Sequence, residues 1–175
     1  MSGFRKCSYC FKRLGWIRVG HDRRNCPYLL SDRNILISKN KIFRENILDQ
    51  ISDQGIGIGS LVSFPTYEYG ITQAVITSAH WDRVSCVSSY RTLHPKYCFE
   101  ATSTRSMVEG RNFAFSLPHV PENRLHVEVL VPQTPASIRK SIPKTWLDGI
   151  SGLDRYFDRK YDPRYQIGLD RSAFI

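Results

Sequence analysis

The stretch CSYCFKRLGWIRVGHDRRNC, residues 7–26, contains four side chains that can bind a metal ion, and these are Cys7, Cys10, His21 and Cys26. Their spacing is Cys-x2-Cys-x10-His-x4-Cys, so two short pairs are separated by one longer loop. Three thiolates and one imidazole form a standard tetrahedral ligand set for zinc. The stretch therefore predicts one structural Zn²⁺ site in which the protein fills every position and none is left for a reactive water. The alternative is a set of reduced thiols that hold no metal.

The same stretch resembles the CCHC zinc knuckle of retroviral nucleocapsid proteins and of many cellular RNA-binding proteins. Gly20 precedes the histidine and Pro27 follows the last cysteine, as in that family, and two arginines stand between the last two ligands. Knuckles have four residues between the second cysteine and the histidine, whereas this chain has ten. The resemblance is therefore to an expanded knuckle over residues 7–26, and it implies zinc binding and contact with nucleic acid.

Positive charge is concentrated in the first quarter of the chain, whose formal net charge is +9. Residues 1–45 contain 11 Lys or Arg against 3 Asp or Glu, whereas residues 46–175 contain 14 against 13. A basic segment joined to a nearly neutral body is typical of proteins that bind polyanions. Because the charge coincides with the metal motif, it favours nucleic acid over the alternative of a basic arm that only improves solubility.

Cations and flat side chains surround the predicted metal site. Basic side chains can neutralise phosphates, and in the knuckles that this one resembles aromatic side chains stack on exposed bases. The predicted nucleic-acid contacts are Lys6, Tyr9, Phe11, Lys12, Arg13, Trp16, Arg18, Arg23 and Arg24. The alternative for Phe11 and Trp16 is that they form a small core of the zinc unit itself.

The chain is predicted to be an α+β protein, with a zinc knuckle at residues 1–28 followed by a linking helix at residues 29–54. Ser38 is the expected N-cap of the amphipathic part of this helix. Apolar side chains then recur on one face, and they are Ile42, Phe43, Ile47, Leu48 and Ile51. We expect this stripe to pack on the body or on a second copy of the chain. The alternating glycines at 55–59 lead from a helix into a strand, whereas a phosphate-binding loop leads from a strand into a helix, so they predict a connector.

Residues 55–132 are predicted to form a small antiparallel β-barrel or sandwich. Short β-branched and aromatic runs are separated by turn-forming residues, and the expected strands are 61–64, 72–77, 84–87, 97–101, 112–117 and 125–131. Six short strands at this spacing are typical of small barrels. The order of the first runs is similar to the opening strands of SH3-like barrels of the Tudor and KOW kind, over about residues 59–108.

Residues 133–175 are predicted to be a helical segment that packs on the body. Apolar side chains recur there at spacings of 4, 3, 4 and 4, which places them on one helical face. They are Trp146, Ile150, Leu153, Phe157 and Tyr161, with Gly149 and Gly152 interrupting the series. The alternating charges that follow are expected to form a solvated face.

A catalytic role is not predicted, and no catalytic residue is assigned. The sequence contains no nucleotide-binding, hydrolase or nuclease motif. The remaining metal-capable residues of the middle of the chain have spacings that match no zinc pattern. They are His80, Cys86, His94 and Cys98, and the two cysteines are expected to be core thiols.

The composition narrows the cellular setting. A hydrophobic content of 41% is enough for a packed core and is unlike a disordered tail. No apolar run approaches the ~18 residues of a membrane span, and the first residues lack an apolar signal segment. We therefore expect an intracellular protein of the cytoplasm, the nucleus or a virion, with reduced cysteines and no membrane contact.

The function expected from these observations is non-catalytic, zinc-dependent binding of RNA or DNA, with single strands preferred. The alternative is a structural or adaptor protein whose zinc unit and helices hold another protein. In either case the 38–54 helix offers a surface for a homodimer or another protein partner. A small protein of this build would suit a large DNA virus.

Overall fold

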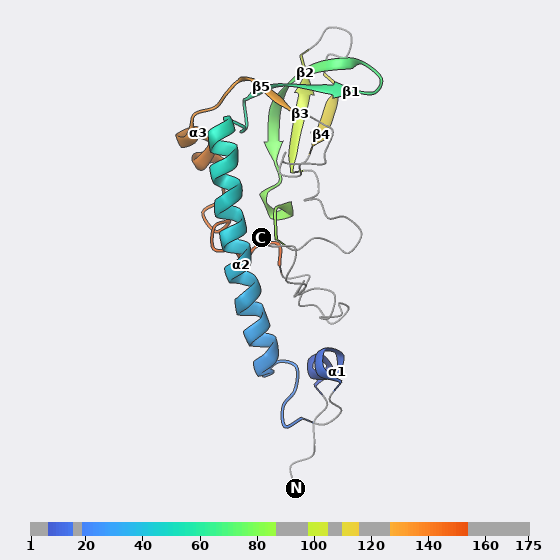
Figure 1. The fold of residues 1–175 in the computed structure, drawn as a ribbon, viewed down its shortest axis with the longest axis vertical. Helices are drawn as coiled ribbons and strands as arrows, with labels where there is room; N and C mark the ends of the chain where they lie inside the picture. The colour runs from blue at the N-terminus through green and yellow to red at the C-terminus, as the bar shows by residue number, and fades with distance from the viewer. Residues whose placement is uncertain (1–6, 16–18, 87–97, 105–109, 116–126, 154–175) are drawn as a thin grey trace.

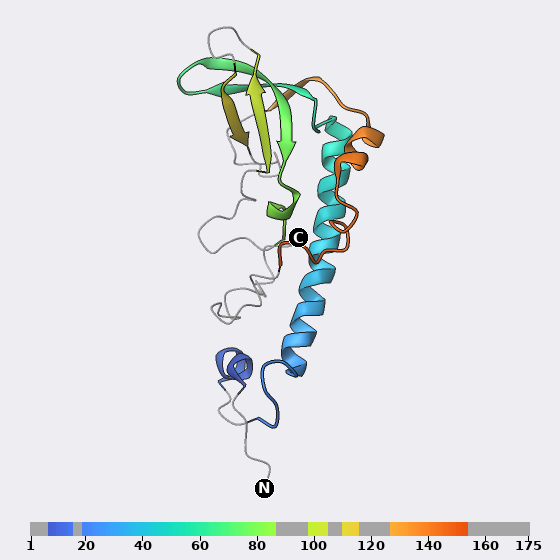
Figure 2. The same ribbon diagram turned by 180° about the vertical axis from the view of Figure 1, so that it is seen from behind.

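The computed structural model describes residues 7–15, 19–86, 98–104, 110–115 and 127–153, and its architecture is α+β, which confirms the predicted class. A long helix, α2, runs from a small N-terminal unit to an antiparallel sheet at the opposite end of the molecule (Figure 1). The helices are α1 (Ser8–Leu14), α2 (Pro27–Gln54) and α3 (Pro135–Ser141), with a 3-10 turn, η1, at Trp81–Arg83. Seen from behind, α3 and the turns that follow it lie alongside α2 (Figure 2).

Helix α2 begins and ends at residues suited to those positions. Cys26 is the N-cap, and its sulfur accepts the backbone N–H of Leu29 at 3.4 Å. Pro27 occupies the first helical position, where no N–H is needed. Gly55 ends the helix with a φ of 70°, a left-handed conformation that glycine adopts without strain. The helix has 28 residues and is therefore about 42 Å long.

The linking helix predicted at 29–54 is present, but Ser38 lies inside it and is not its N-cap. In the C-terminal half, Ile47, Leu48 and Ile51 are buried in the main core and Phe43 packs against it. The predicted stripe, except for the exposed Ile42, therefore packs on the body of the same chain.

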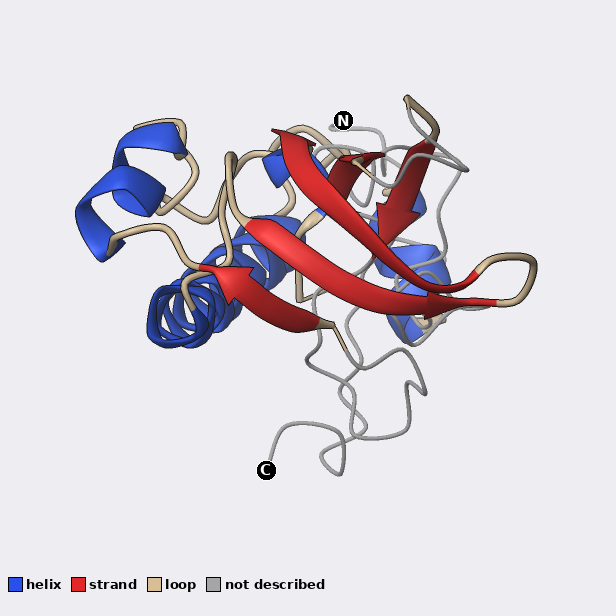
Figure 3. Ribbon diagram, turned by 90° about the horizontal axis from the view of Figure 1, so that it is seen from above, coloured by secondary structure: helices blue, strands red, loops and turns tan. Residues whose placement is uncertain are grey.

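The sheet has five strands in the order β4-β3-β2-β1-β5, and all neighbours are antiparallel. The strands are β1 (Leu61–Thr66), β2 (Gly70–Ala79), β3 (Phe99–Ser103), β4 (Asn112–Phe115) and β5 (Glu128–Val131). Figure 3 shows the twist of the sheet and α2 beside it. Among the described strands β4 and β5 each have one neighbour, so the sheet is open. The predicted β-rich body, a small antiparallel barrel or sandwich, is therefore an antiparallel sheet that does not close into a barrel.

The strand predicted at 84–87 is wrong for the residues that the structure describes. Val84 is the C-cap of η1, and Ser85 and Cys86 continue as a loop. The N–H of Cys86 donates to the side-chain oxygen of Asn40 on α2 at 2.9 Å. Val84 and Ser85 are buried because the loop runs against that helix. The third run of the SH3-like order is therefore not a strand, and the likeness is limited to the β1–β2 hairpin.

The helical face predicted from Trp146 onward is a series of turns in the described part, and α3 lies earlier in the chain. Gly149 has a φ of +77°, and a Cβ atom at this residue would lie 2.6 Å from the carbonyl oxygen of Ile37 on α2. The glycine therefore breaks the helical pattern and lets the turns touch α2. Phe157 and Tyr161 lie outside the described residues.

A buried arginine joins α2 to these turns. Arg44 is fully buried, and its guanidinium donates to the carbonyl oxygens of Val84, Trp146 and Ser151 at 2.9, 2.6 and 2.6 Å. The same group lies 5.1 Å from the centre of the Trp146 ring. Burial lowers the pKa of Arg44 to about 10, so the side chain stays charged at neutral pH. Of the two cysteines predicted to be core thiols, Cys98 is fully buried and Cys86 is half-buried.

Candidate metal centre

The four predicted ligands come from two helix N-termini and one loop. Cys7 is the N-cap of α1, and Cys10 lies in the first turn of that helix. Cys26 is the N-cap of α2, and His21 lies in the loop that precedes it. A helix N-terminus carries partial positive charge, which favours a thiolate. The backbone amides at the start of α1 therefore favour the ionised form of Cys7.

The ligand atoms converge on one point. The Sγ of Cys10 lies 3.2 Å from the Nε2 of His21 and 3.5 Å from the Sγ of Cys26. One ligand atom from each of the four residues, including Cys7, lies within 4.8 Å of every other. A tetrahedral zinc ion with Zn–S bonds of about 2.3 Å separates its sulfur ligands by about 3.7 Å. The cluster therefore fits one metal ion at its centre, as the sequence predicted.

The charge balance of the cluster also suits a cation. Cys7, Cys10 and Cys26 are buried, and all are free thiols. Burial, together with the sulfurs of Cys26 and Cys7, raises the pKa of Cys10 to about 12. For Cys7, burial acts in the same direction, but the amides of Cys10 and Tyr9 outweigh it, so its pKa is lowered. A divalent cation would relieve the repulsion among three neighbouring thiolates.

The N-terminal unit, defined here as residues 7–15 and 19–26, is attached to α2 by more than the chain. The hydroxyl of Tyr9 donates to a carboxylate oxygen of Asp32 at 2.7 Å, and both side chains are buried. The guanidinium of Arg23 lies 5.3 Å from the centre of the Tyr9 ring. These contacts orient the unit on the first turns of α2.

The loop between His21 and Cys26 is ordered by a side chain that the sequence interpretation did not single out. One carboxylate oxygen of Asp22 accepts the backbone N–H groups of Arg24 and Asn25 at 2.9 and 3.2 Å. Aspartate often forms such a turn with the residues that follow it, so this role had a recognisable local signal. Asp32 had none, because its partner lies 23 residues away.

The predicted nucleic-acid contacts have different environments. Tyr9 is 2% exposed, so its ring lies in the core of the N-terminal unit and not on its surface. Phe11 is 57% exposed, and Arg24 is exposed as well. Lys12 and Arg23 are half-buried. Arg13 belongs to α1 but its side chain is outside the description, and Lys6, Trp16 and Arg18 lie outside the described residues.

Among the residues that the structure describes, no second group of three or more metal-capable side chains occurs. His80 instead pairs with Glu100, with 2.8 Å between Nε2 and Oε1. The hydroxyl of Ser78 donates to the other carboxylate oxygen at 3.0 Å. His94 lies outside the described residues.

Comparison of the chain with protein-family models, with curated proteins and with solved structures gave no match. None of the described helices is both long enough and apolar enough to cross a lipid bilayer.

Proposed function

We propose that this chain is a zinc-dependent nucleic-acid-binding protein with no catalytic activity. The observation that carries the proposal is the convergence of Cys7, Cys10, His21 and Cys26 within 4.8 Å, inside the most basic part of the chain. Three thiolates and an imidazole favour zinc over magnesium, calcium or manganese, which prefer oxygen ligands. Because the protein supplies all four ligands, the ion is structural.

The exposed side chains of the N-terminal unit support contact with nucleic acid. Phe11 lies on the surface of α1, although a small unit gains stability by burying aromatic rings. Lys12 and Arg13 follow it directly, and Arg24 is exposed on the loop before α2. An exposed apolar ring in a basic segment can stack on a base while the basic side chains of that segment neutralise phosphates.

Single strands of RNA or DNA are the expected ligands. A ring can stack on a base only where that base is unpaired, and single strands offer such bases throughout. Tyr9 has a different role in this proposal. Its hydroxyl donates to Asp32 and its ring packs against the guanidinium of Arg23. Tyr9 therefore positions the unit and does not touch the nucleic acid.

The first test is metal content followed by strand binding on the same sample. Elemental analysis should find about one zinc ion per chain, and a labelled 20-nucleotide strand should bind with an affinity that falls steeply as salt rises. Cys10→Ser should lose both the zinc and the strand affinity. Cys86→Ser is the matched control, because Cys86 is a half-buried thiol outside the cluster and should retain both. Absence of zinc, or strand binding that survives its removal, would contradict the proposal.

A second candidate is an adaptor that binds another protein through α2. The observation that favours it is a set of exposed aliphatic side chains on this helix, namely Leu30, Ile35 and Ile42. An adaptor would bind no strand even at low salt, and its association with a protein partner would depend little on salt. Sedimentation at several concentrations, with Ile42→Asp as the variant, tests whether this surface joins two copies of the chain.

A further inference from the structure

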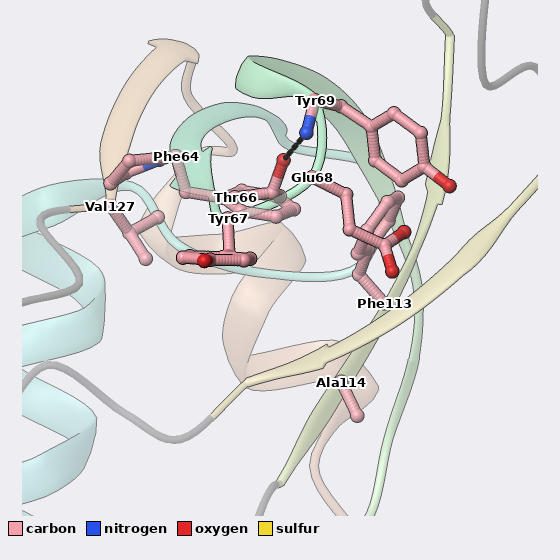
Figure 4. Close-up of a pocket in the computed structure, with 9 residues that line it drawn as sticks. Phe64, Thr66, Tyr67, Glu68, Tyr69, Phe113, Ala114 and Val127 are labelled. Atoms are coloured by element: carbon pink, nitrogen blue, oxygen red, sulfur yellow. Dashed lines mark hydrogen bonds between the residues drawn. The ribbon is translucent and has the colours of Figure 1, made fainter.

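A pocket opens beside the β1–β2 hairpin, where the sheet curls so that β1 and β4 approach one another (Figure 4). Its volume is about 290 Å³. The Phe64 and Phe113 rings, from β1 and β4, meet edge to face with centres 5.4 Å apart. Val127 adds an aliphatic wall, and the Tyr67 ring stands fully exposed at the mouth. The pocket therefore has an apolar floor and an exposed flat ring at its opening.

The rim of the pocket is polar and close to neutral. Glu68 points its carboxylate toward Phe113 (Figure 4) and lies 3.5 Å from the guanidinium of Arg111. That guanidinium also donates to the hydroxyl of Tyr69 and lies 4.8 Å from the centre of its ring. Arg111 thus offsets the charge of Glu68, so a strand that carries phosphates would not be repelled from the rim.

The size and chemistry of the pocket limit its guest. The volume lies at the lower end of the range for ligand pockets, which leaves room for one ring system. Aromatic walls prefer a flat guest. The carboxylate of Glu68 is a hydrogen-bond acceptor with more lone pairs than its contact with Arg111 uses, so an N–H group on the edge of the guest can donate to it.

We propose that this pocket binds one unpaired nucleobase with an exocyclic amino group, stacked on Tyr67 and hydrogen-bonded to Glu68. Adenine, cytosine and guanine carry such a group, whereas thymine and uracil present carbonyl oxygens at the corresponding edge positions. The inference rests on the proposed function and deepens it, because the same strand would touch the N-terminal unit and the pocket.

The N-terminal unit and the sheet that carries the pocket lie at opposite ends of α2 (Figure 1). The helix between them has 28 residues and is about 42 Å long. A stacked strand advances about 3.4 Å per nucleotide, so about 12 nucleotides are needed to reach from one contact to the other. A 20-nucleotide strand can engage both contacts at once, and a 5-nucleotide strand cannot.

The test compares dC20 with dT20 by fluorescence anisotropy on the full chain loaded with zinc. Wild-type protein should bind dC20 more tightly than dT20. Tyr67→Ala should lower the dC20 affinity about 10-fold, the loss expected for one stacked base, and should leave dC5 affinity nearly unchanged. Tyr67→Phe should restore dC20 binding, and Glu68→Gln should reduce the preference for dC20 over dT20. Ile71→Ala is the matched control, because Ile71 is an exposed side chain on the same hairpin.

The outcomes separate the inference from the function on which it rests. If wild-type protein binds both strands in a zinc-dependent manner and Tyr67→Ala changes the affinity for neither strand, the pocket does not bind a base and the inference is overturned. If wild-type protein binds neither strand at low salt, the proposed function fails and the inference fails with it. A preference for dC20 over dT20 that is unchanged in Glu68→Gln would overturn the assignment of Glu68 as the group that selects the base.

Discussion

The N-terminal unit and the β-sheet body are stabilised in different ways. Among the described residues, the core of the N-terminal unit consists of Cys7, Tyr9, Cys10 and Cys26, and three of these are metal-capable. The body buries a continuous cluster of aliphatic and aromatic side chains from α2, the sheet, η1 and the C-terminal turns. We expect a unit with so few buried side chains to depend on a bound ion, and we expect the body, with its larger apolar core, to fold without one.

Removal of the metal should reveal the largest difference in stability between the N-terminal unit and the body. Chelation, or Cys10→Ser, should unfold the N-terminal unit and fray the first turns of α2, because Cys26 caps that helix. Structural zinc contributes about 10–16 kcal/mol to small zinc units, so protection should be lost almost completely there. Hydrogen exchange should rise in residues 7–36 and stay unchanged in β1 and β2. Equal loss in both regions would show that the body also depends on the ion.

Replacement of the buried Arg44 should destabilise the body and leave the N-terminal unit unchanged, which is the reverse of the effect expected for metal removal. Arg44→Ala leaves three carbonyl oxygens without their donor and removes a side chain that packs on Trp146. We expect a loss of about 3 kcal/mol or more in the free energy of unfolding of the body. Urea denaturation measures it, and zinc content should not change. Glu45→Ala, an exposed neighbour on α2, is the control and should have little effect.

Disturbing the close approach of the C-terminal turns to α2 should cost less stability than replacing Arg44. Gly149→Ala would bring a Cβ atom within 2.6 Å of the Ile37 carbonyl oxygen at a φ of +77°. We expect a loss of about 1–3 kcal/mol, measured as a lower thermal midpoint. Gly110→Ala has a similar φ of +76° with no neighbouring atom within 4 Å, so it reports the backbone strain alone. Equal losses for the two variants would contradict the close approach.

Loss of the ion pair between His80 and Glu100 should have the smallest effect on stability. Hydrogen bonds from His80 and Ser78 hold the pKa of Glu100 below its ordinary value. A carboxylate with a lowered folded-state pKa stabilises the fold above its unfolded-state pKa and loses this contribution as the pH falls through the folded value. NMR titration of the Glu100 carboxyl should therefore show its pKa rising toward the ordinary value in His80→Ala, and by less in Ser78→Ala. An unchanged titration curve would mean that the pair does not form in solution.

Local patterns predicted the elements whose residues interact with near neighbours in the chain. The hairpin of β1 and β2 was foreseen because two β-branched runs flank a short turn. The prediction of a strand at 84–87 was wrong because a short run with β-branched residues also occurs in a loop that is buried against a helix. The buried state of Tyr9 could not be foreseen, since its partner Asp32 lies on a different helix.

The sequence by itself determined the ligand set of the candidate metal centre, because the spacing of Cys7, Cys10, His21 and Cys26 is a local property and zinc selects those donor atoms by their chemistry. Tertiary structure alone decided which aromatic rings of the chain are available to a ligand. It buried Tyr9 and left Phe11 exposed, and it brought Phe64 and Phe113 together from strands that are distant in the sequence. The physical reason is that burial is settled by contacts between distant segments, which no local spacing records.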